Sequence, residues 1–151
     1  RLPCDLAVTG GLAWSEDFSE TVAKLGLAGR VRRLGHVARR EMPLLYHGAL
    51  ALAFPSLFEG FGLPILEAMT LGCPVCYATG SSMGEIAGDA GIAVAPDERD
   101  AIVEAMRVLW TDSSRRTALA QAGRERAGSF TWARTAAATL DAYRLALAAA
   151  R

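Results

Sequence analysis

The chain has 151 residues, of which 52% are hydrophobic and 21% are charged, and its 16 basic residues balance 16 acidic residues. This composition predicts a soluble globular domain with a buried core, and it argues against a disordered chain and against a membrane-spanning one. The equal numbers of basic and acidic residues also argue against a nucleic-acid-binding surface, which usually needs a local basic excess.

Short apolar runs alternate with helical patterns along the chain. This alternation predicts an α/β fold in which βαβ units form a parallel, Rossmann-like sheet flanked by helices. The expected strands are residues 5–9, 31–34, 50–54, 75–78 and 92–95. The expected helices are 15–26, 40–47 and 64–72, and then three that follow an N-cap at Asp97 and are broken near Asp112 and Gly128, with 80–84 as a loop.

The most informative feature of the sequence is a glycine turn between an expected strand and an expected helix. Gly60 and Gly62 permit a tight turn, and Pro64 fits the first position of a helix. Free backbone N–H groups at a helix N-terminus can bind phosphate oxygens. The flanking carboxylates of Glu59 and Glu67 can accept hydrogen bonds from sugar hydroxyl groups. The pattern therefore predicts a site for a sugar attached to a phosphate.

Several segments between about Leu6 and Tyr143 carry a resemblance to a known family. They are residues 35–37, 51–56, 59–64, 67–69, 72–75, 85–91 and 130–132. With them the chain resembles the C-terminal domain of retaining glycosyltransferases of the GT-B fold, most closely family four (glycosyl transferases group 1). In such enzymes this domain binds the nucleotide sugar, and a separate N-terminal domain binds the acceptor. The resemblance thus implies that residues 1–151 are a nucleotide-sugar-binding domain, truncated at its N-terminus and lacking the acceptor domain.

The resemblance also implies roles for the two carboxylates. Glu67 would accept hydrogen bonds from the ribose hydroxyl groups of the donor. Glu59 would lie at the donor hexose and its phosphate, as the expected catalytic residue. Two structural alternatives stay open, a helix-capping carboxylate for Glu67 and a solvated loop charge for Glu59.

The resemblance assigns the rest of the donor site to the glycine turn and to a segment after the second expected strand. These residues are Gly60, Phe61, Gly62, Leu63, His36 and Val37. The turn residues would offer backbone N–H groups to the sugar and the phosphates, and the last two residues would line the base. A surface histidine without a ligand is the open alternative for His36.

The implied activity is metal-independent transfer of a hexose, of mannose or glucose type, from a nucleoside-diphosphate sugar to a glycan or lipid-linked acceptor, as in polysaccharide biosynthesis. No cofactor besides this donor is expected, and the two histidines, His36 and His47, are not spaced with another metal ligand. An Arg and a Lys that usually neutralise the diphosphate in the family have no matching segment here. This chain alone is therefore expected to be inactive. Two other functions stay open, half of a nucleotide-sugar epimerase and a non-catalytic nucleotide-binding module.

The expected location is the cytoplasm. No signal peptide is apparent, and the odd number of cysteines, 3, suits a reducing compartment better than a disulfide framework. No transmembrane segment is expected, so any peripheral membrane contact would be made through the missing domain. Cys73 and Cys76 form a Cys-x-x-Cys pattern, but Cys73 follows a helix and Cys76 lies in a strand, which favours structural thiols over a redox pair.

The last expected helix, over 132–150, is rich in alanine and leucine. Two interpretations stay open for it. It could contact the missing domain, or it could cover the sheet of its own domain.

Overall fold

The computed structural model describes residues 4–10 and 16–150. They form two compact units, Arg1–Leu45 and Tyr46–Arg151. In the first unit, strands β1 (Leu6–Thr9) and β2 (Val31–Gly35) pair in parallel, joined through helix α1 (Glu16–Lys24). Ser15, the first residue of the helix expected over 15–26, lies outside the described residues.

The second unit is built on a three-stranded parallel sheet in the order β3-β4-β5. The strands are β3 (Leu52–Phe54), β4 (Val75–Ala78) and β5 (Ile92–Val94). The helices are α2 (Met42–Gly48), which spans the boundary between the units, α3 (Leu63–Thr70), α4 (Met83–Ala87), the short 3-10 helix η1 (Gly88–Ala90), α5 (Arg99–Thr111), α6 (Ser113–Ala127) and α7 (Trp132–Ala149).

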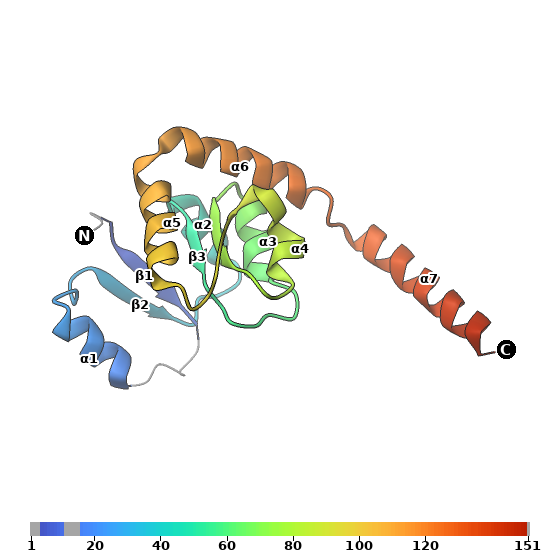
Figure 1. Ribbon diagram of the computed structural model, residues 1–151, viewed down its shortest axis with the longest axis horizontal. Coiled ribbons are helices and arrows are strands. Elements are labelled where there is room, and N and C mark those ends of the chain that lie inside the picture. Colours follow the sequence, from blue (N-terminus) through green and yellow to red (C-terminus); the bar gives the residue numbers. More distant parts are fainter. Residues whose placement is uncertain (1–3, 11–15, 151) are drawn as a thin grey trace. The chain divides into compact units, whose positions relative to one another are not determined.

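Strand β4 is the centre of this unit, and all four of its residues are buried. Successive side chains of a strand point to opposite faces, so Cys76 packs on the face covered by α5, in a cluster with Ala105 and Leu109. Helices α3 and α4 contact the sheet from the other side (Figure 1). Helix α6 bridges the layers because it contacts both α3 and α5. The sheet is therefore covered on both faces, as expected for parallel strands.

The parallel strands and flanking helices confirm the expected α/β class, but three local expectations were wrong. The segment 80–84 is not a loop throughout, because α4 begins at Met83. Asp97 is not the N-cap of α5, which begins at Arg99 after Glu98 and has no side-chain cap. Helix α3 begins at Leu63, one residue before Pro64, so the proline occupies its second position.

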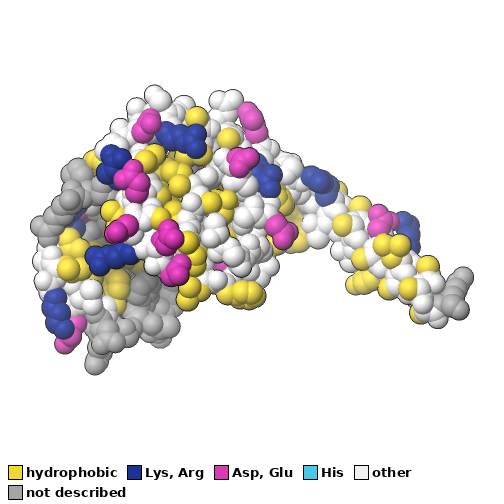
Figure 2. Space-filling model, in the orientation of Figure 1, with side chains coloured by type: hydrophobic (Ala, Val, Ile, Leu, Met, Phe, Trp, Pro, Cys, Tyr) yellow, Lys and Arg dark blue, Asp and Glu magenta, His cyan; other side chains and the backbone are white. Residues whose placement is uncertain are grey.

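Helix α7 does not cover the sheet of its own unit, because every described residue of the helix is exposed. Trp132, Leu140, Tyr143 and Leu147 recur at helical spacing and leave 88%, 54%, 64% and 68% of their surfaces exposed. Hydrophobic side chains accordingly lie along the surface of the helix (Figure 2). Of the two interpretations of this segment, only contact with something outside the unit agrees with its exposure. Among the described residues, no helix is long and apolar enough to cross a membrane.

Candidate functional site

The glycine turn leaves the carboxyl end of β3 and opens α3. Gly62 precedes the helix with φ 98° and ψ 41°, a left-handed conformation that favours glycine. A Cβ atom added at Gly62 would also lie 3.4 Å from the Cγ atom of Met83 at the start of α4. The turn therefore favours a glycine here because of its backbone angles, whereas an added Cβ atom would only be in ordinary van der Waals contact with α4.

A second loop, at the carboxyl end of β4, holds this turn in place. The Ser82 hydroxyl donates a hydrogen bond of 2.8 Å to the backbone carbonyl of Glu59. The hydroxyl oxygen of Ser81 is buried and has no hydrogen-bond partner among the described residues. The two loops therefore meet at the carboxyl edge of the sheet, where open parallel sheets bind their ligands.

The start of α3 presents unused backbone donors. Among the residues that the structure describes, no acceptor is bonded to the N–H groups of Phe61, Gly62 or Leu63. The Gly62 carbonyl is already used, because it accepts from the N–H groups of Ile65 and Leu66. Free N–H groups together with the positive end of a helix dipole form a favourable environment for an anion.

The Phe61 ring contacts the segment that joins α6 to α7. Phe61 and Phe130 meet edge to face with their ring centroids 6.4 Å apart. The guanidinium of Arg126 lies 5.8 Å from the centroid of the Phe130 ring. Arg126 also donates hydrogen bonds to the carbonyls of Glu85 and Ile86 in α4. These contacts link the turn, α4 and the end of α6.

Glu67 is partly buried and has a specific partner. The hydroxyl of Tyr46 in α2 donates to its Oε2 atom over 3.4 Å. The helix-capping alternative for Glu67 was wrong, and Glu67 does not lie at the helix start. Because α3 begins at Leu63, Glu67 lies in the second helical turn, beyond the reach of the dipole at the helix start. It is also no helix cap, since the N-terminus of α3 has no side-chain cap.

The Glu59 side chain is partly buried, in contrast to the solvated loop charge of the alternative. Within the described part of the chain, no ion pair or hydrogen bond engages its carboxylate. The catalytic role of Glu59 and the ribose contact of Glu67 stay predictions.

The predicted base-binding residues belong to the other unit. His36 is exposed and Val37 is partly buried, and they follow Gly35, whose φ of 63° ends β2. Glu59, Glu67 and the glycine turn all belong to the second unit, whereas His36 and Val37 belong to the first. Their contact with a base stays a prediction.

The two cysteines of the Cys-x-x-Cys pattern are free and buried. Burial raises the pKa of both thiols from 9.0 to about 11. A redox pair needs the opposite shift, because the reactive form is the thiolate. This environment agrees with the structural interpretation of Cys73 and Cys76.

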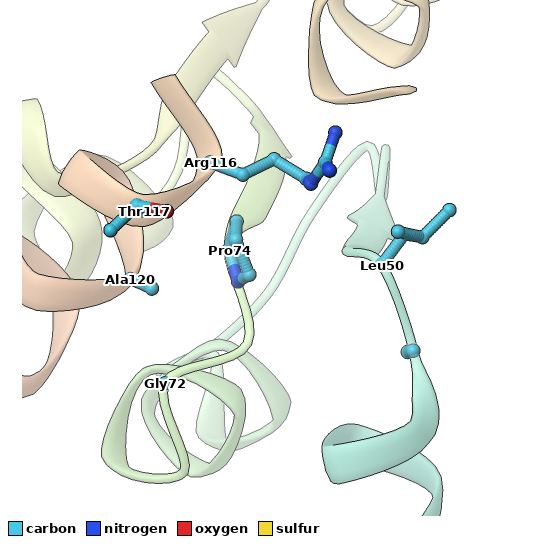
Figure 3. A pocket seen from close by; sticks show the side chains of 7 residues that line it. Leu50, Gly72, Pro74, Arg116, Thr117 and Ala120 are labelled. Atoms are coloured by element: carbon cyan, nitrogen blue, oxygen red, sulfur yellow. The ribbon is translucent and has the colours of Figure 1, made fainter. Parts of the chain in front are cut away.

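One hollow of about 200 Å³ lies at the opposite edge of the sheet (Figure 3). Leu50 and Pro74 line it, just before the start of β3 and β4, together with Arg116 from α6. The Arg116 guanidinium already donates to the carbonyls of Leu109 and Trp110, over 2.9 and 2.8 Å, at the end of α5. The hollow is therefore separate from the glycine turn, and its charged side chain, Arg116, already stabilises the end of α5.

Sequence reasoning missed the residues that support the turn and Glu67. Tyr46 lies 21 positions before Glu67 and Ser82 lies 23 positions after Glu59. Neither spacing follows a helical or strand period, so no local signal connects the partners. Phe130 stands in a segment that carries the resemblance, but the sequence gives no reason to pair it with Phe61.

The family profile described as "Glycosyl transferases group 1" matches residues 2–126 of the chain. The chain is 37% identical over 147 residues to O-antigen chain mannosyltransferase B of Escherichia coli, covering 96% of this chain and 38% of that relative. It thus spans well under half the length of this curated relative.

Solved structures of glycosyltransferases share the fold. A sucrose-phosphate synthase from Thermosynechococcus elongatus aligns with a TM-score of 0.81 at 26% identity, covering 96% of this chain and 39% of its own. HepE from Anabaena, solved in complex with UDP, aligns with a TM-score of 0.71 at 25% identity, covering 82% of this chain and 36% of its own. These matches confirm both the resemblance and the expected fold class.

Proposed function

We propose, because this chain belongs to the family of glycosyl transferases group 1, that it is the part of a glycosyltransferase that binds the nucleoside-diphosphate sugar. One observation carries this proposal. The glycine turn at the carboxyl edge of the sheet leaves the N–H groups of Phe61, Gly62 and Leu63 without acceptors at the start of a helix. Phosphate oxygens of a donor fit such a set of N–H donors.

The carboxylates on either side of the turn divide the remaining tasks. Glu67, partly buried and held by Tyr46, accepts hydrogen bonds from the ribose hydroxyl groups. Glu59, whose backbone carbonyl is fixed by Ser82, faces the hexose and its phosphate. His36 and Val37 line the base of the donor.

The transferred sugar is a hexose of mannose or glucose type, and the acceptor is a glycan or a lipid-linked acceptor. The name of the Escherichia coli relative, a mannosyltransferase, supports mannose, and HepE, also solved in complex with UDP-glucose, supports glucose. The reaction proceeds with retention of configuration and without a metal ion. The diphosphate leaves while the acceptor hydroxyl attacks from the same face of the sugar.

Binding of nucleotides to the chain tests the proposal. An NMR titration with GDP, UDP and ADP and with their sugars should give a dissociation constant on the order of millimolar, about −4 kcal/mol, because the basic pair expected for the diphosphate is missing. Glu67→Gln should weaken binding by roughly 1–3 kcal/mol, the range for a poorly paired polar group.

The matched control is Glu104→Gln, which changes an exposed glutamate on α5 that pairs with Arg107. It should leave the dissociation constant unchanged. If no nucleotide binds to the unmodified chain, the donor-site proposal fails. If Glu67→Gln binds as tightly as the unmodified chain, only the ribose role of Glu67 is lost.

A further inference from the structure

We propose that Tyr46 is a positioning residue for ribose recognition, because its hydroxyl holds the Glu67 carboxylate where that carboxylate must bind a nucleotide. The inference rests on the proposed function and adds a residue that lies outside the glycine turn. Tyr46 does not touch the ligand in this scheme. It acts through Glu67 and so favours ribonucleotide donors over donors that lack ribose hydroxyl groups.

The geometry is that of a buried donor aimed at a half-buried acceptor. Tyr46 is 6% exposed, and its hydroxyl oxygen lies 3.4 Å from Oε2 of Glu67. Hydrogen bonds between two oxygens usually span about 2.5–3.0 Å. In active sites without ligand such bonds are often long and shorten when the ligand binds. The contact therefore has room to tighten when ribose engages the same carboxylate.

The direction of the bond is fixed by chemistry. Burial first, and then the neighbouring Glu67 carboxylate, raises the pKa of Tyr46 above its ordinary value of 10.0. The phenol thus keeps its single O–H group, and an ionised carboxylate can only accept. Tyr46 is the donor, and it occupies one of about four lone-pair sites of Glu67.

The remaining lone pairs are what a ribose diol requires. A free glutamate side chain samples several rotamers and loses that freedom when it binds. A carboxylate already held by Tyr46 loses less, because support from a neighbouring side chain fixes the binding group in advance. Removal of the hydroxyl should therefore weaken only those complexes in which Glu67 binds ribose.

The competing explanation is that the Tyr46 hydroxyl only stabilises the fold. Tyr77 serves as the control for such a structural role. Tyr77 is 4% exposed and its hydroxyl donates to the carbonyl of Gly88 over 3.0 Å. It has the same chemistry and burial as Tyr46, but no carboxylate of the site. Tyr77→Phe is therefore the matched control for loss of a buried tyrosine hydroxyl group.

The experiment compares UDP with 2′,3′-dideoxy-UDP by NMR titration of the unmodified chain, Tyr46→Phe and Tyr77→Phe. The unmodified chain should prefer UDP by about tenfold or more, because the dideoxy analogue leaves Glu67 without its partners. Tyr46→Phe should weaken UDP binding by about five- to tenfold and change dideoxy-UDP binding by less than about twofold. Tyr77→Phe should leave the ratio of the two affinities unchanged. In a Glu67→Gln background, Tyr46→Phe should have no further effect on the ratio.

Each other result overturns the inference. Equal weakening of both nucleotides by Tyr46→Phe shows a structural role, and unchanged affinities for both show no role. If the unmodified chain binds UDP without preferring it to the dideoxy analogue, ribose is not read by Glu67 and Tyr46 has nothing to position. If it binds neither nucleotide, the proposed function itself fails. Should Tyr46→Phe not fold, 3-fluorotyrosine at position 46 keeps the ring and makes the hydroxyl a stronger donor, so it should raise the preference for UDP. An unchanged preference then overturns the inference.

Discussion

At the scale of single residues, the turn depends on the backbone freedom of one glycine. Gly62 has a left-handed backbone, which side chains rarely adopt, although a Cβ atom there would meet α4 only at ordinary van der Waals distance. The serines of the neighbouring loop behave differently from each other. Ser82 fixes the carbonyl of Glu59, whereas the Ser81 hydroxyl is buried without a partner in the described part of the chain. An unsatisfied buried hydroxyl costs about 1–3 kcal/mol, and such costs tend to be retained at functional sites.

The thiols of β4 and the turn before it should make the chain sensitive to alkali. Burial raises the pKa of Cys73 and Cys76 from 9.0 to about 11. Between these values the folded state binds more protons than the unfolded state. The contribution of the two thiols to the free energy of unfolding is therefore fully present below pH 9, and it decreases as the pH rises toward 11. The slope is at most about 1.4 kcal/mol per pH unit for each thiol. Denaturant unfolding at a series of pH values measures it.

A variant with both cysteines replaced by alanine should show a smaller loss of stability over the same pH window. Both native thiols should also react with a thiol reagent at neutral pH only after unfolding, because the reactive thiolate is disfavoured. Rapid reaction of Cys73 or Cys76 in the folded chain would contradict the structural interpretation.

At the scale of elements, the strands and long helices could be predicted from sequence because their apolar periods are local properties. Helix α4 could not, because the sequence of residues 80–84 consists largely of turn-forming glycine and serine. The helix forms because tertiary contacts override that preference: Met83, Ile86 and Ala87 are buried, and Arg126 bonds to its last carbonyls. The site divides in the same way. The turn and its carboxylates were found from sequence, whereas their partners, far along the chain, were not.

The contact of Arg126 with α4 gives an element-scale prediction. Arg126→Lys keeps the positive charge but loses the planar fork that reaches both the Glu85 and Ile86 carbonyls and lies over the Phe130 ring. We expect a loss of roughly 1.5–3 kcal/mol in the free energy of unfolding, the range for hydrogen bonds to a charged group. Backbone amide exchange in α4 should accelerate most. The control is Arg115→Lys, on the exposed side of α6, which should have little effect.

Equal exchange rates for α4 in the unmodified chain and in Arg126→Lys would show that burial of the apolar side chains alone holds this helix. A selective effect on α4 would also connect the turn to the end of α6, because Phe130 contacts Phe61.

At the scale of the whole molecule, the residues that the resemblance assigns to the donor are distributed over both compact units. The turn and the carboxylates come from the second unit, and His36 and Val37 come from the first. Helix α7 leaves its apolar residues exposed over its whole length. This exposure fits a helix that packs against additional protein surface.

The last prediction is that this chain alone transfers no sugar, even where it binds the donor. Transfer requires donor and acceptor to be held at reactive distance, and such positioning can contribute roughly 7–11 kcal/mol to lowering the barrier. The proposed function gives this chain the donor only, and it spans 38% of the mannosyltransferase relative. Stabilisation of the leaving diphosphate is commonly the largest catalytic contribution, and the usual Arg and Lys have no matching segment. The assay is release of nucleoside diphosphate from a panel of nucleotide sugars, with and without acceptor glycans, run beside O-antigen chain mannosyltransferase B as the active control. Neither transfer nor donor hydrolysis should rise above the uncatalysed rate. Turnover by the 151-residue chain at an ordinary enzymatic rate would contradict the donor-half proposal, since the chain would then contain a complete active site.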